Sequence, residues 1–93
     1  PEDGKINFKL SSNEIYNWVR AQAFPYPGAF LFYNNNKIII DKIKIINNNY
    51  DKKLPNGFII KVNPLIIKVS DGLIELTKIR NSNNLFELNK KFN

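Results

Sequence analysis

The 93-residue sequence contains no cysteine and no histidine. Without cysteine the chain forms no disulfide and offers no thiolate to a metal. Without histidine it lacks imidazole for acid–base catalysis and as a zinc ligand. Carboxylate, lysine, tyrosine and serine side chains remain, and no two of them occur at a spacing that defines a catalytic pair. The composition therefore argues against a catalytic or metal site within this chain.

Long apolar segments are also missing. No run approaches the roughly 18 residues that a membrane-spanning helix needs, and no secretory signal peptide is recognisable. The absence of cysteine is compatible with a reducing cytosol, so we expect a cytoplasmic protein with no membrane partner. The chain begins at Pro1 rather than at a methionine, so we expect a single domain, residues 1–93, from a longer protein.

Basic residues outnumber acidic ones. Fourteen lysines and arginines against eight acids give a net charge of +6, which favours polyanionic partners such as nucleic acid or phosphates. Several lysines alternate with isoleucines on β-like runs. If they share one face, we expect a phosphate-binding or RNA-binding patch, and if they are scattered, only a solvated surface. The candidates are Lys37, Lys42, Lys44, Lys61 and Lys68.

One helix is predicted near the start of the chain. Ser11 and Glu14 form an S-x-x-E capping box, and apolar residues then recur at helical spacing to about Ala23. Pro25 ends the helix, because the residue before a proline is pushed out of the α region.

Five short β-strands are predicted after the helix, at residues 29–33, 37–46, 57–62, 65–69 and 73–80. Asparagines 34–36 and the Asp71-Gly72 pair predict tight turns. In the second strand, Ile38 and Ile40 have the opposite parity to Ile43 and Ile45. This change predicts a β-bulge near residues 41–42. Residues 85–92 have the spacing of a short final helix.

These elements predict a mainly β fold. We expect a small antiparallel Greek-key, OB-like open barrel preceded by one N-terminal α-helix. The unusual feature is the stretch AFPYPGAF at residues 23–30, which joins the helix to the first strand through two prolines, a tyrosine and a glycine. Such a loop is rigid and aromatic, and it loses little entropy when it docks on another surface.

Residues 3–30, DGKINFKLSSNEIYNWVRAQAFPYPGAF, resemble the start of the C-terminal domain of 10-formyltetrahydrofolate-dependent formyltransferases. The shared features are a D-G-x-I opening, a capped helix ending I-Y-x-x-V-R-A, and P-Y-P-G-A-F. The resemblance continues more weakly through PNGFIIKV and SDGLIEL, to about residue 80. It implies that this chain follows an N-terminal catalytic domain, which carries the catalytic asparagine, histidine and aspartate and uses 10-formyltetrahydrofolate.

The resemblance also implies a role for the loop. In that family this region lies near the seam with the catalytic domain, where the amine substrate binds. The implied substrate or domain-interface residues are Tyr16, Arg20, Phe24, Pro25, Tyr26, Pro27 and Gly28. The alternative for Tyr26 and Arg20 is that they only hold the loop to the helix. The chain itself is expected to have no catalytic residue and to bind no cofactor or metal.

Three functions remain open on sequence grounds. P-Y-P-G-A-F and VNPLIIKVSDGLIEL look closer to formyltransferases that act on an amino sugar nucleotide. The positive charge favours instead the tRNA-binding domain of a methionyl-tRNA formyltransferase. A stand-alone OB-like nucleic-acid-binding module is the third, in which Phe30, Phe32 and Tyr33 would stack on bases. That module requires at least two exposed aromatic side chains flanked by lysines.

Overall fold

A computed structural model describes residues 4–80 and 86–93. Its element order is α1 (Ser12–Gln22), β1 (Ala29–Tyr33), β2 (Asn36–Ile46), β3 (Ile59–Val62), β4 (Leu65–Val69) and β5 (Gly72–Ile79). All five strands pair antiparallel in one sheet of order β1-β2-β5-β4-β3. β3, β4 and β5 are neighbours in chain order. A long connection leads from β2 to β3, so that β2 pairs with β5 rather than with β3, which is a Greek-key arrangement. The predicted mainly β fold with one N-terminal helix is confirmed, as an open sheet rather than a closed barrel.

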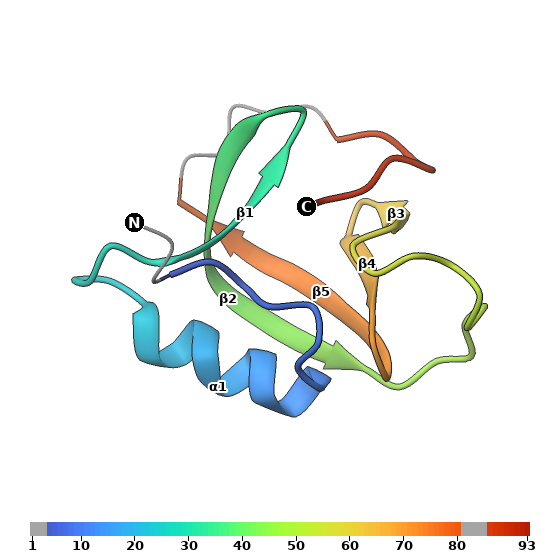
Figure 1. Cartoon of the computed structure of the whole chain (residues 1–93), viewed down its shortest axis with the longest axis horizontal. Helices are drawn as coiled ribbons and strands as arrows, with labels where there is room; N and C mark the ends of the chain where they lie inside the picture. Colours follow the sequence, from blue (N-terminus) through green and yellow to red (C-terminus); the bar gives the residue numbers. More distant parts are fainter. Residues whose placement is uncertain (1–3, 81–85) are drawn as a thin grey trace.

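The helix begins as its capping box predicts. The Glu14 amide donates to Ser11 Oγ at 3.1 Å, and the Ser11 amide donates to Glu14 Oε1 at 2.9 Å. The turn between β4 and β5 also holds this helix end, because Asp71 Oδ1 accepts from the Ser12 amide at 2.8 Å. Ile15 and Val19 are buried against the sheet, where α1 packs mainly on β2 (Figure 1).

The bulge predicted in the second strand is confirmed. The register between β2 and β5 shifts on both sides of Lys42. Ile38, Ile40 and Ile43 are buried although the parity changes between them. The bulge therefore allows one long strand to keep both halves of its apolar pattern in the core.

The predicted final helix is wrong for residues 86–93, and residue 85 lies outside the described residues. This segment has no helix: it makes a turn at Leu88 and Asn89 and then runs between the two edge strands (Figure 1). Asn93 exchanges backbone hydrogen bonds with Phe32 of β1, and the Ile59 amide of β3 donates to the Lys90 carbonyl. Phe92 is fully buried against Tyr33 and Phe86. The tail has the residue spacing of a helix, but its backbone hydrogen-bonds to strand edges that would otherwise be unpaired.

Candidate functional site

The loop of residues 24–28, named the FPYPG loop below, leaves the helix in a fixed direction. α1 ends at Gln22, and Ala23 already has an extended backbone. Phe24–Pro25 is a cis peptide bond, and Gly28 has a φ of +100°. Phe24 is 79% and Tyr26 62% exposed, so the loop presents two aromatic rings to solvent.

An ion pair that sequence reasoning missed holds this loop. Arg80, which follows β5, donates from Nη2 to Asp41 Oδ1 at 2.7 Å and from Nε to Oδ2 at 3.0 Å. Its Nη1 donates to the Pro27 carbonyl at 3.0 Å, and its guanidinium lies 5.9 Å from the centre of the Phe24 ring. The two ends of the FPYPG loop are thus tied to the sheet through one arginine.

The electrostatics of this clamp favour the charged forms. The hydrogen bonds from Arg80 lower the pKa of Asp41, against a smaller opposing effect of burial. The charges of Arg80 and Lys78 and a backbone hydrogen bond from Phe24 lower it further. Asp41 is 8% exposed and Arg80 28%, so the carboxylate is the more buried partner. We name Asp41 and Arg80 the loop clamp.

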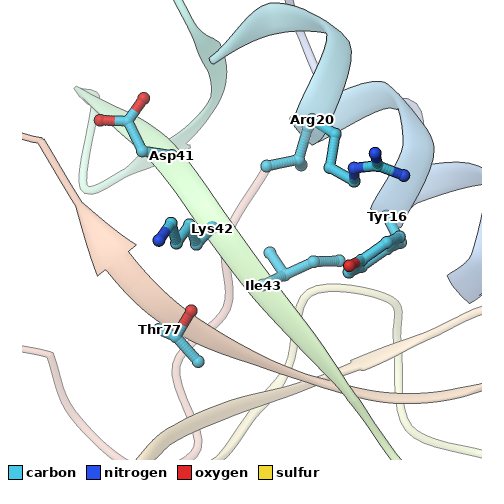
Figure 2. A pocket seen from close by; sticks show the side chains of 7 residues that line it. Tyr16, Arg20, Asp41, Lys42, Ile43 and Thr77 are labelled. Atoms are coloured by element: carbon cyan, nitrogen blue, oxygen red, sulfur yellow. The ribbon is translucent and has the colours of Figure 1, made fainter. Parts of the chain in front are cut away.

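A pocket of about 310 Å³ lies beside the clamp, between α1 and the sheet. Figure 2 shows Tyr16 and Arg20 on the helix side and Lys42 and Thr77 on the strand side. Arg20 stacks over the ring of Tyr16 at 5.6 Å. The structure therefore brings together Tyr16, Arg20 and Lys42, which the sequence proposed for two different roles. Among the residues described, the Arg20 side chain donates no hydrogen bond to a carbonyl of the FPYPG loop.

The candidate lysines do not form one surface. Lys42 and Lys44 are exposed on β2, and Lys44 pairs in register with Glu75. Lys61 lies on β3, separated from β2 by two strands. Lys37 lies at the start of β2, with its ammonium 4.3 Å from the centre of the Phe30 ring.

Lys68 is buried at 7% exposure and donates to Asn56 Oδ1 at 3.0 Å. It faces the loop after β2 rather than a surface open to a large polyanion.

The aromatic residues of β1 do not form a base-stacking platform. Phe30 is 4% and Tyr33 2% exposed, and the Tyr33 hydroxyl accepts from the Glu87 amide at 3.0 Å. Only Phe32 is partly exposed on this strand. The aromatic side chains proposed to stack on bases are thus buried or half-buried, so the OB-like nucleic-acid-binding module is not supported.

Comparison with known proteins assigns the chain to a family. A family model described as "Formyl transferase, C-terminal domain" matches residues 1–87. The chain belongs to this formyltransferase C-terminal domain family. A curated relative, the bifunctional polymyxin resistance protein ArnA of Wigglesworthia glossinidia brevipalpis, is 45% identical over 76 residues. That match includes 82% of this chain and 11% of the relative, so the formyltransferase C-terminal domain spans a small part of that protein.

The described parts of this formyltransferase C-terminal domain contain no helix long and apolar enough to cross a membrane. Residues 4–80 and 86–93 also contain no group of three or more acidic side chains that would hold a metal ion. The chemical features that stand out are therefore the clamped FPYPG loop and the adjacent cationic pocket.

Proposed function

We propose that this chain is the non-catalytic C-terminal domain of a cytoplasmic enzyme that transfers a formyl group from 10-formyltetrahydrofolate to the amine of a nucleotide-linked sugar. Membership of the family supports the formyl transfer. The chain supplies one wall of the substrate cleft through the FPYPG loop, docked against the enzyme's own N-terminal catalytic domain. A loop fixed before docking loses little conformational freedom on association.

The observation that carries the choice of substrate is the placement of the lysines. A tRNA-binding surface needs several cations that track a phosphate backbone. Here Lys68 is buried, Lys44 lies opposite Glu75, and Lys61 lies on β3, which two strands separate from β2. A dispersed set suits a small anionic substrate better than a long polyanion. The relative named above for polymyxin resistance, rather than for tRNA, is consistent with this choice.

The folate is assigned to the rest of the parent protein. The pocket beside the clamp is lined by charged and hydroxyl side chains, and a second pocket is formed by Lys5, Asn7, Leu10 and Trp18. Both are open to solvent rather than enclosed, so we assign the folate site to the N-terminal catalytic domain.

The test uses the full-length protein that contains this domain. It is incubated with 10-formyltetrahydrofolate and either an amino sugar nucleotide or methionyl-tRNA, and mass spectrometry detects the gain of one formyl group. We expect formylation of the sugar nucleotide. Formylation of methionyl-tRNA instead would establish the alternative that the +6 charge favours.

A matched pair of variants tests the role of the loop. Tyr26→Ala removes an exposed ring from the FPYPG loop, and Leu88→Ala removes an exposed apolar side chain from the C-terminal segment. We expect kcat/KM to fall about tenfold for Tyr26→Ala, as for the loss of one good contact, and to stay unchanged for Leu88→Ala. Equal kcat/KM values for the two variants would show that the FPYPG loop does not form part of the substrate cleft.

A further inference from the structure

The pocket between α1 and the sheet lies in a region of uncompensated positive charge. Arg20 and Lys42 line it, and Lys78 is close enough to Asp41 to lower the pKa of that carboxyl. Among the described residues, Asp41 is the only carboxylate in the lining, and Arg80 already pairs with it. Figure 2 shows its carboxylate pointing away from Tyr16 and Thr77. One carboxylate that is already paired with Arg80 leaves an excess of positive charge around the pocket.

The backbone register places like charges next to one another at the same point. Lys42 pairs with Lys78 across β2 and β5, whereas the next exposed lysine of β2, Lys44, pairs with Glu75. Opposed like charges destabilise a sheet, and opposite charges stabilise it. Across residues 4–80 and 86–93, neither Lys42 nor Lys78 forms an ion pair. A bound anion would relieve a repulsion that the fold leaves in place.

Hydrogen-bond donors are available in the same pocket. The hydroxyls of Tyr16 and Thr77 make no hydrogen bond to another described residue, and both side chains line the pocket. Arg20 is exposed and lies over the Tyr16 ring. Exposed side chains change rotamer within picoseconds to nanoseconds, so the guanidinium can turn towards an anion without any change of the fold. Two cations and two hydroxyls together match the acceptor oxygens of a phosphate group.

We propose that this pocket binds a phosphate group of a small phosphorylated ligand, with Arg20 and Lys42 supplying the charge and Tyr16 and Thr77 donating hydrogen bonds. Its volume of about 310 Å³ is at the lower end of ligand pockets, which suits a phosphate or diphosphate rather than a whole nucleotide. The inference goes beyond the proposed function, because phosphate binding does not require formyl transfer.

The test measures the Kd of inorganic pyrophosphate for the full-length protein by isothermal titration calorimetry at low salt. The double variant R20Q/K42Q removes both charges of the pocket. The control K44Q/K61Q removes the same charge from exposed lysines outside the pocket. We expect the Kd to rise at least about tenfold in R20Q/K42Q, because each lost charged hydrogen bond weakens binding, and to change less than about twofold in the control.

Further variants separate hydrogen bonding from charge. Y16F/T77V keeps the charge and removes both hydroxyls, and we expect a rise in Kd of about threefold to tenfold. All substituted residues are exposed, so the variants should remain folded, with melting temperatures close to that of the parent protein. A nucleoside diphosphate that competes with pyrophosphate identifies a nucleotide as the source of the phosphate, and absence of competition identifies a free phosphate.

Three results would overturn the proposal. One is an absence of pyrophosphate binding to the parent protein at low salt. Another is an equal loss of affinity in R20Q/K42Q and K44Q/K61Q, which would mean that only the overall charge matters. The third is tRNA binding that depends on Arg20 and Lys42 while pyrophosphate binding does not. None of these depends on the formyl-transfer assay, so this proposal and the proposed function can fail separately.

Discussion

Replacing Gly28 by alanine should loosen the FPYPG loop, because a side chain at this position is disfavoured by the backbone and by its neighbours. Gly28 has a φ of +100°, a region that L-residues rarely adopt. A Cβ at this position would lie 2.5 Å from Ile39 Cγ2 and 3.1 Å from Arg80 Nη2. Carbon atoms pack comfortably at about 3.5–4.0 Å, so Ile39 would have to move by about 1 Å. The Arg80 side chain is held by its ion pair with Asp41, so it cannot easily move away from the new methyl group.

The magnitude follows from these two effects. Backbone strain of this kind costs about 1–3 kcal/mol, and overpacking costs a further 1–3 kcal/mol or so. Alanine restricts the unfolded chain and returns about 0.4–1 kcal/mol. We therefore expect Gly28→Ala to lower the free energy of unfolding by about 3 kcal/mol. For a domain of this size that corresponds to a Tm lower by roughly 12–24 °C.

Urea unfolding followed by circular dichroism measures this change, with Gly72→Ala as the control. At Gly72 a Cβ would meet no atom within 4 Å, and the φ is not in the left-handed region. The control should change stability by less than about 0.5 kcal/mol. If both variants lose the same stability, the loop is not held against Ile39 and Arg80 as described.

Three further predictions concern other parts of the molecule. Because the pKa of Asp41 is lowered in the folded state, its contribution is present above the unfolded value near 3.8 and is lost as the pH falls through the lower, folded pKa. Asp41→Asn should therefore be less stable at neutral pH, and its difference from the parent should shrink as the pH is lowered below 3.8 in urea titrations. Ser11→Ala removes the capping box and should cost about 1 kcal/mol by the same assay, whereas Asn13→Ala, exposed on the first turn, should cost little. Phe92→Ala should cost about 3–5 kcal/mol, and Leu88→Ala less than about 1, because Phe92 is fully buried and Leu88 is 53% exposed; equal losses would contradict the docking of the tail.

Most of the fold could be predicted from local signals. The capping box set the start of α1, the proline set its end, and the asparagine turn joined β1 to β2. Asn34 and Asn35 adopt φ values of +49° and +64°, as a tight hairpin turn of this kind requires. Each of these features depends on residues only a few positions apart. Local chemistry was therefore sufficient to predict them.

The errors concern contacts between distant segments. The tail has helical spacing, but its backbone pairs with strands that end about 30 or more residues earlier. Lys68 alternates with apolar residues on β4 and was a candidate for an exposed contact, yet Asn56 covers its ammonium. Alternation predicts the face on which a side chain lies, but it does not predict whether a loop covers that face.

The bulge at Asp41 links what the sequence predicted to what it missed. The change of parity revealed that the strand is irregular there, but it gave no reason for the irregularity. A bulge re-aims the side chains next to it. Here Asp41 turns to Arg80, 39 residues further along the chain, while its neighbour Lys42 lines the pocket. The same irregularity thus positions both the loop clamp and the cationic pocket. In a regular β2 without the extra residue, side chains would alternate strictly between the two faces, so half of its isoleucines would leave the core. Asp41 would then no longer face Arg80. The irregularity therefore has a structural role, the placement of Asp41 and Lys42, that no residue near it in sequence reveals.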